Sequence, residues 1–139
     1  MSSTAETTDQ IRPTILVVDD EPNVTQAISR SLHGLANVLT ANNGWAAYKT
    51  LTDGENVDFV ILDVTMPEYD SVELLGDLRA AGCFPRVILF SGWNRDFLRR
   101  VADLAVLFGF DVVGFYEKPL NSTKLLDLMN SSANQKLFA

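Results

Sequence analysis

Ile15-Leu16-Val17-Val18-Asp19-Asp20-Glu21-Pro22 is the stretch that decides the fold of this chain. Its four apolar residues predict a buried strand, and two adjacent aspartates stand where that strand ends. Pro22 then comes where it can open a helix. Because open α/β sheets bind their ligands at the carboxyl ends of the strands, the stretch predicts a polar site at one edge of a parallel sheet.

Three further apolar runs end in side chains that can bind or react. The runs at 59–62 and 87–90 lead to Asp63 and Ser91, and a fourth run leads to Lys118. Because the carboxyl ends of parallel strands lie at the same edge of a sheet, we expect these side chains to lie together. Oxygen groups beside one amine are typical of a metal-dependent site that handles an anion.

The predicted cluster has the groups needed for nucleophilic chemistry on a phosphoryl group. If Asp19, Asp20 and Asp63 ionise within a few Å, each pair repels by about 4 kcal/mol at 4 Å under an effective dielectric of about 20, so a cation is needed. Carboxylate oxygens favour Mg²⁺ or Mn²⁺. Asp63 is then a candidate nucleophile, with Lys118 to neutralise transferred charge and the Ser91 hydroxyl to hold a phosphoryl oxygen.

Strand and helix signals alternate along the whole chain, which predicts right-handed crossovers and a parallel sheet covered on both faces. Residues 1–12 are polar and rich in Ser and Thr, so we expect a flexible lead-in. Residues 13–131 form the expected single domain, and residues 132–139 a tail or the start of a linker. The expected strands are 14–19, 37–40, 57–62, 86–90 and 111–116. The expected helices are 22–34, 44–53, 70–81, 94–108 and 121–131.

Composition excludes several classes of protein. The chain has 139 residues, 47% of them apolar, and a net charge of 11 − 18 = −7, which argues against a nucleic-acid partner. Cys83 is the single cysteine, so no internal disulfide is possible. No apolar run is long enough to span a bilayer, and the N-terminus lacks the layout of a signal peptide. We therefore expect a cytoplasmic protein with no membrane partner.

Together these motifs resemble the receiver (phosphoacceptor) domain of two-component response regulators. The resemblance covers about residues 14–130 and implies a flavodoxin-like doubly wound sheet of five parallel strands in the order 2-1-3-4-5, with helices on both faces. The matching pieces are Val18-Asp19-Asp20-Glu21-Pro22, Leu62-Asp63-Val64-Thr65-Met66-Pro67, Phe90-Ser91-Gly92 and Glu117-Lys118-Pro119-Leu120.

The resemblance also implies a role for each part of the site. Asp63 would accept a phosphoryl group from a histidine kinase or a phosphotransfer protein, and the domain would assist only its own phosphorylation and dephosphorylation. Asp20 and Asp63 would bind Mg²⁺, with Mn²⁺ as the alternative ion, through their side chains. Asp19 would bind the ion largely through water, and Thr65 through its backbone carbonyl.

Signal transmission is implied by the resemblance as well. Lys118 would contact the phosphoryl group, Ser91 would move toward it, and Phe115 stands at the aromatic switch position of the family. The output surface would be the fourth helix, the fifth strand and the fifth helix, facing a downstream output protein or domain. A homodimer through the Gly- and Phe-rich stretch 108–115 is possible, although a buried core explains that stretch equally well.

The chain departs from the common pattern of the family at three places. Ser71 stands where a glycine is common, and Phe115 has no hydroxyl, so any switching there works by packing alone. The segment between Ser91 and Lys118 is longer than in the commonest receivers by roughly five residues, more than one helical turn. Residues 104–117 look like those of variant receivers often linked to cyclic-di-GMP phosphodiesterase domains.

Other functions remain open at this stage. A pseudo-receiver would act as a constitutive protein-binding module, although the complete acidic set argues against it. A cofactor carrier of the same fold needs a loop that cradles phosphate after the first strand, where Asp19 and Asp20 would repel one. A hydrolase that forms an aspartyl-phosphate needs a second acid two residues after Asp63, where Thr65 stands.

Overall fold

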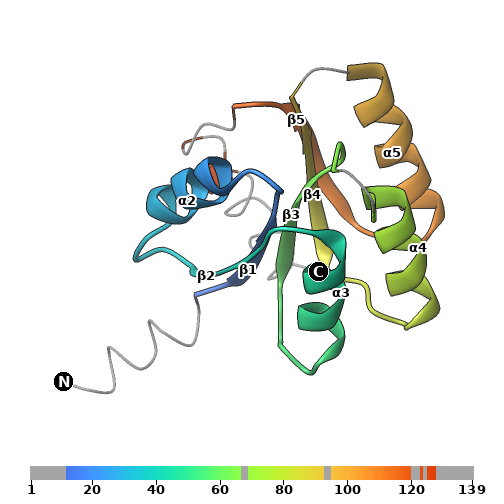
Figure 1. Ribbon diagram of the computed structural model, residues 1–139, viewed down its shortest axis with the longest axis horizontal. Helices are drawn as coiled ribbons and strands as arrows, with labels where there is room; N and C mark the ends of the chain where they lie inside the picture. The colour runs from blue at the N-terminus through green and yellow to red at the C-terminus, as the bar shows by residue number, and fades with distance from the viewer. Residues whose placement is uncertain (1–11, 67–68, 93–94, 120–122, 124, 128–139) are drawn as a thin grey trace.

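The computed structural model describes residues 12–66, 69–92, 95–119, 123 and 125–127 (Figure 1). Five strands form one parallel sheet in the order β2-β1-β3-β4-β5, which confirms the predicted fold. The strands are β1 Thr14–Val18, β2 Asn37–Ala41, β3 Phe59–Asp63, β4 Arg86–Ser91 and β5 Val112–Glu117. The helices are α2 Pro22–Ser31, α3 Gly44–Thr52, α4 Ser71–Ala80 and α5 Arg95–Leu107.

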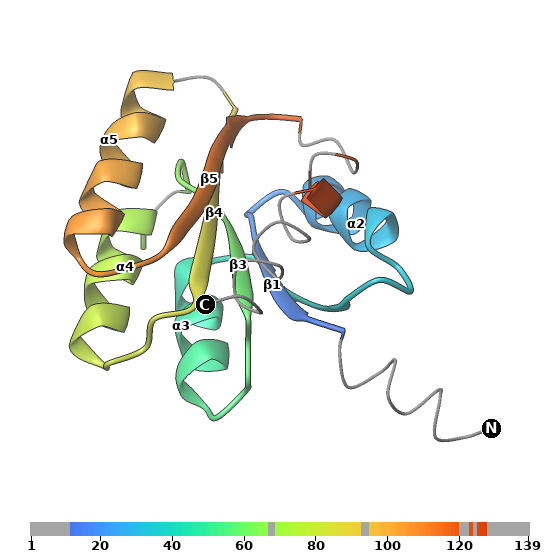
Figure 2. The same ribbon diagram turned by 180° about the vertical axis from the view of Figure 1, so that it is seen from behind.

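Helices cover both faces of the sheet. α2 lies on one face, and α3, α4 and α5 lie on the other (Figures 1 and 2). Side chains alternate along β1, so Leu16 and Val18 pack toward α3–α5 while Ile15 and Val17 pack toward α2. Leu125 is also buried in the core on the α2 face. The expected helix 121–131 falls mostly outside the described residues.

Most elements differ from their predicted ranges by one to three residues at an end, and α2 and β3 are two examples. α2 ends at Ser31 and not at Gly34, because Gly34 adopts a positive φ of 80° in the turn that follows. β3 runs from Phe59 to Asp63, so the aspartate belongs to the strand and pairs in register with Phe90 of β4. This pairing fixes the main chain of Asp63 at the edge of the sheet.

An irregularity in the β4–β5 pairing accommodates part of the long segment before Lys118. Val87 pairs with Val112, but Ile88 pairs with Gly114, so one residue of β5 is left over. α5 precedes this bulge and has 13 residues, more than any other described helix. No helix within the described part of the chain is long and apolar enough to cross a membrane.

Candidate functional site

The carboxyl ends of four strands bring the predicted site residues to one edge of the sheet, uppermost in Figure 1. Asp19 follows β1, Asp63 ends β3 and Ser91 ends β4. Lys118 follows β5. Its backbone N–H donates to the Ser91 carbonyl at 2.8 Å, which extends the backbone hydrogen bonding between β4 and β5 by one residue. Parallel pairing therefore collects residues that lie up to a hundred positions apart in the sequence.

Lys118 is the centre of this site. Its Nζ lies 2.9 Å from Asp19 Oδ2, 3.2 Å from Asp63 Oδ2 and 3.3 Å from Glu21 Oε1. The ring of Phe90 lies on another side, with its centroid 5.1 Å from the ammonium. One ammonium thus contacts three carboxylates at the place where sequence reasoning expected a cation.

Burial makes this charge cluster costly. Asp19 is fully buried and Asp63 nearly so, whereas only 16% of the Lys118 side chain is exposed. Desolvation raises the pKa of Asp19 to about 6, outweighing the opposing effects of the Glu21 N–H and of Lys118. Burial alone would lower the pKa of Lys118, but its contacts with Asp19 and Asp63 outweigh burial and raise that pKa above its ordinary value.

The two carboxylate oxygens of Asp63 have different surroundings. Oδ1 accepts hydrogen bonds from the backbone N–H and from the hydroxyl of Thr65, each at 3.0 Å. Oδ2 accepts one from Lys118 Nζ. The side chain is therefore held in one orientation, with Oδ2 on the Lys118 side.

The acidic residues suit a hard divalent cation. Asp19, Asp20 and Glu21 offer carboxylate oxygens that lie within 4.8 Å of one another. Asp19 Oδ2 is buried and has no hydrogen-bond partner among the described residues, so its contact with Lys118 is an ion pair only. Asp63 does not belong to this close group. Its Oδ1 accepts hydrogen bonds from Thr65, and its Oδ2 accepts one from Lys118.

The two predicted switch residues lie in different surroundings. Ser91 is fully buried, and its hydroxyl has no hydrogen-bond partner within the described part of the chain. Phe115 lies on β5, is 38% exposed and pairs in register with Leu89, which packs into the core beneath α3–α5. The backbone of Ser91 therefore lies beside that of Lys118 at the end of β4, whereas Phe115 lies on the α5 side of the sheet.

Two residues, Ser71 and Tyr69, make buried contacts beside the loop after β3, and sequence reasoning singled out only Ser71. Ser71 is fully buried, and its hydroxyl donates to the Val64 carbonyl at 3.1 Å. Tyr69 is also buried, its hydroxyl donates to Asp77, and its ring lies 4.2 Å from that of Trp45. The unusual serine at position 71 was the one signal in the sequence that pointed to this loop.

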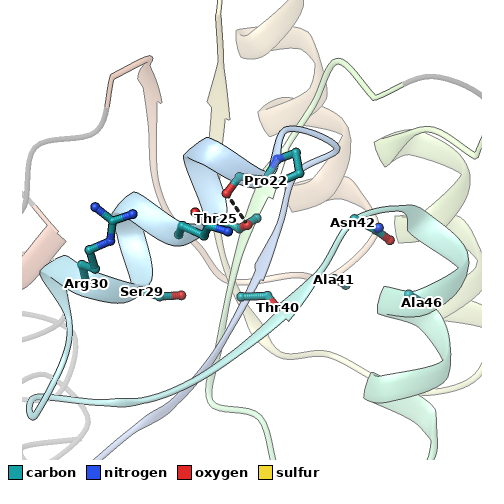
Figure 3. A pocket seen from close by; sticks show the side chains of 9 residues that line it. Pro22, Thr25, Ser29, Arg30, Thr40, Ala41, Asn42 and Ala46 are labelled. Atoms are coloured by element: carbon teal, nitrogen blue, oxygen red, sulfur yellow. Dashed lines mark hydrogen bonds between the residues drawn. The ribbon is translucent and has the colours of Figure 1, made fainter.

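A groove of about 720 Å³ lies between α2, the end of β2 and the start of α3 (Figure 3). Pro22 and Thr25 line it on the α2 side, with the Thr25 hydroxyl bonded to the Pro22 carbonyl at 3.0 Å. Thr40 and Asn42 line the opposite side. None of the predicted site residues lines this groove, so it is separate from the carboxylate cluster.

Comparison with known proteins identifies relatives across nearly the whole described fold. Residues 15–130 match the family model of the response regulator receiver domain. Sensor kinase CckA of Brucella abortus is 34% identical over 112 residues, which cover 79% of this chain and 12% of CckA. A chemotaxis protein CheY homolog of Campylobacter jejuni is 38% identical over 68 residues, which cover 48% of this chain and 52% of that protein.

Solved structures show the same architecture. A response regulator receiver domain protein from Clostridium thermocellum has a TM-score of 0.74 at 29% identity, covering 91% of this chain and 98% of that one. A response regulator from Colwellia psychrerythraea has the same fold, with a TM-score of 0.73 at 24% identity, covering 88% and 98% of the two chains. By contrast, the aligned regions span only 12% and 52% of the lengths of CckA and the CheY homolog.

Proposed function

Because the chain belongs to the response regulator receiver family, we propose that it is a phosphorylation-driven signalling switch whose phosphoryl acceptor is Asp63. Receiver domains act in signalling and are not general catalysts. The phosphodonor would be a histidine kinase or a phosphotransfer protein. The observation that carries the proposal is the orientation of Asp63, whose Oδ2 faces Lys118 while Thr65 holds Oδ1.

This orientation selects the nucleophilic oxygen. Oδ2 attacks the phosphorus of a phosphohistidine, a bond forms between Oδ2 and phosphorus, and the bond from phosphorus to the imidazole nitrogen breaks. The imidazole leaves with the electron pair of that bond and takes up a proton. Lys118 and the buried Ser91 hydroxyl then bind oxygens of the transferred group.

A divalent cation is part of the proposal. Asp19, Asp20 and Asp63 would hold Mg²⁺ or Mn²⁺, together with the backbone carbonyl of Thr65. When bound, the ion would neutralise negative charge on the phosphoryl oxygens. The support is a group of hard oxygen ligands that includes a buried carboxylate oxygen without a hydrogen-bond partner.

We propose that the phosphorylated state is transmitted to the face formed by α5, β5 and the helical residues 125–127. Once Ser91 and Lys118 bind the phosphoryl group, Phe115 repacks toward the core, and phosphorylation biases an equilibrium between two arrangements of this face. The partial exposure of Phe115 beside α5 supports this role. A downstream output protein or domain would read the difference.

The test is phosphorylation by a small-molecule donor followed by intact mass measurement. Acetyl phosphate with Mg²⁺ is expected to add one phosphoryl group to the wild-type chain, and chelation of the cation is expected to abolish the gain. Asp63→Asn is expected to gain nothing, while the exposed Asp53→Asn serves as the matched control. No gain in the wild-type chain, or an equal gain in Asp63→Asn, would contradict the proposal.

A further inference from the structure

Glu21 stands directly before α2, at the position from which a side chain can cap the helix. It is the N-cap residue, with extended φ and ψ of −97° and 109°, but its carboxylate makes no capping hydrogen bond. Ser, Thr, Asp and Asn are the favoured residues at this position, because their short side chains reach the free N–H groups of the first turn. The Glu21 carboxylate binds none of these N–H groups, so it is available for other contacts.

The carboxylate of Glu21 is directed toward the acidic site. Its Oε1 lies 3.3 Å from Lys118 Nζ, and the same side chain belongs to the close group of oxygens with Asp19 and Asp20. Its backbone N–H donates to Asp19 Oδ1 at 2.9 Å, which ties the two residues together. Glu21 therefore adjoins both the ammonium and the oxygens that suit a cation.

The three carboxylates around Lys118 differ in exposure. The side chains of Asp19 and Asp63 are 0% and 2% exposed, whereas that of Glu21 is 63% exposed. A divalent cation held by Asp19, Asp20 and Asp63 would take Asp19 Oδ2, which now pairs with Lys118, and would repel the ammonium. Of the present partners, Glu21 is the one that lies at the outer side of the cluster and can still pair with Lys118.

We propose that Glu21 is a positioning residue that takes up the Lys118 ammonium when a divalent cation binds to the buried aspartates. The inference rests on the proposed function, because it concerns how the acceptor site exchanges one positive charge for another. Glu21 keeps the ammonium beside Asp63 Oδ2, where a phosphoryl group arrives, and relieves its repulsion from the cation.

The affinity for a divalent cation distinguishes a positioning role of Glu21 from a role as a direct ligand of the ion. Lys118→Met removes the competing charge, so we expect tighter binding of the cation. Glu21→Gln removes the carboxylate that receives the ammonium, so we expect binding weaker by roughly two- to fivefold, as for a partly exposed charge pair. In the Lys118→Met background there is no ammonium to receive. The logarithm of the change in Kd caused by Glu21→Gln is therefore expected to be less than half of its value in the wild-type background.

The experiment is a titration of the full chain with Mn²⁺, with free Mn²⁺ measured by electron paramagnetic resonance, followed by competition with Mg²⁺. The proteins are the wild type, the two single variants and the double variant. Glu55→Gln is the matched control, because Glu55 is an exposed glutamate in the turn after α3, outside the acidic cluster. Far-UV circular dichroism verifies that each variant is folded before titration.

Three results would overturn the inference. The wild-type chain could fail to bind Mn²⁺, Glu21→Gln could bind as tightly as the Glu55→Gln control, or Glu21→Gln could weaken binding equally in both backgrounds. The last result would make Glu21 a direct ligand of the ion and not a partner of Lys118. Failure of the proposed function has a different signature, since a chain that binds Mn²⁺ as predicted but gains no phosphoryl group contradicts the acceptor role alone.

Discussion

At the scale of single residues, the buried carboxylate of Asp19 lowers the stability of the fold. Asp19 is fully buried. Among the described residues, one of its oxygens accepts a hydrogen bond from the Glu21 N–H, and the other has an ion pair with Lys118 and no hydrogen bond. A neutral side chain in this place would lose much less hydration free energy on folding than a carboxylate does. Retaining a carboxylate there is understandable if a cation or a phosphoryl group is bound during function.

The raised pKa of Asp19 gives a prediction about pH. Its pKa of about 6 in the folded state lies above its ordinary value of 3.8, so the folded state binds more protons between these values, and stability falls as pH rises from about 4 through about 6. In a chelating buffer, Asp19→Asn is expected to exceed the wild type in unfolding free energy by roughly 1–3 kcal/mol at pH 8. The difference is expected to shrink toward pH 4.

Urea denaturation of both proteins between pH 4 and 8 checks this prediction. The difference between the two curves isolates Asp19, because the other acidic groups titrate in both proteins. An Asp19→Asn variant less stable than the wild type at pH 8 would show that the ion pair with Lys118 outweighs the desolvation of the carboxylate.

Ser71 is the second residue with a local consequence. Its buried hydroxyl donates to the Val64 carbonyl, which closes the loop that begins at Asp63. Ser71→Ala is expected to lower the unfolding free energy by about 1 kcal/mol, because a buried carbonyl loses its donor. The control is Ser31→Ala, whose exposed hydroxyl donates to the Ala27 carbonyl and whose loss is expected to change little. Equal effects in denaturant titrations would contradict a special role for Ser71.

At the scale of elements, α3 packs closely against the loop after β3. Asn43 caps α3 by accepting from the Ala46 N–H at 2.8 Å, and Gly44 follows as the first helical residue. A Cβ at Gly44 would lie 2.6 Å from the backbone carbonyl oxygen of Tyr69. The start of α3 thus packs against a loop whose other end carries Asp63.

Gly44→Ala tests this contact between elements. The added methyl group has no room, and the obstacle is backbone, so we expect a loss of about 1–3 kcal/mol in unfolding free energy. Gly76→Ala in α4 is the matched control, because its Cβ would meet only Phe108 at 3.9 Å, and alanine favours the helix by about 0.5–1 kcal/mol. Thermal and denaturant unfolding compare the two, and equal stability of both variants would show that the loop gives way easily.

At the scale of the whole molecule, the doubly wound sheet separates packing from chemistry. The central strands β1, β3 and β4 are buried between two layers of helices, while the acidic site lies at the carboxyl ends of the strands. The core on both faces can therefore stay intact while charges change at one edge. Binding at that edge is still coupled to folding, because the site exists only when β1, β3 and β5 are paired.

A cation that binds the folded site is expected to stabilise the whole molecule. At a free Mg²⁺ concentration 100-fold above Kd, the gain is about 2.7 kcal/mol, which corresponds to a rise in Tm of roughly 5–10 °C. Asp20→Asn, which removes an exposed carboxylate of the ligand group, is expected to reduce the rise strongly. Differential scanning calorimetry with NaCl of equal ionic strength as the control checks this, and an equal rise in both proteins would place the ion elsewhere.

The strand order was implied by the resemblance to receiver domains. The sequence by itself determined the parallel sheet with helices on both faces and the collection of Asp19, Asp63, Ser91 and Lys118 at one edge. Both follow from the alternation of buried strands and amphipathic helices, because right-handed crossovers leave few other topologies and align the carboxyl ends of parallel strands. The ends of the elements were less predictable. Asp63 proved to be part of β3, because pairing with β4 extends the strand beyond its apolar run.

Only the tertiary structure decided how these side chains share their contacts. Lys118 adjoins three carboxylates, and Glu21, which the sequence shows merely as the residue after two aspartates, is one of them. The contact of Gly44 with Tyr69 was equally invisible in the sequence. Such contacts join segments that are far apart in the chain, and their geometry depends on loop conformations and rotamers that are set when the sheet and its helices pack together.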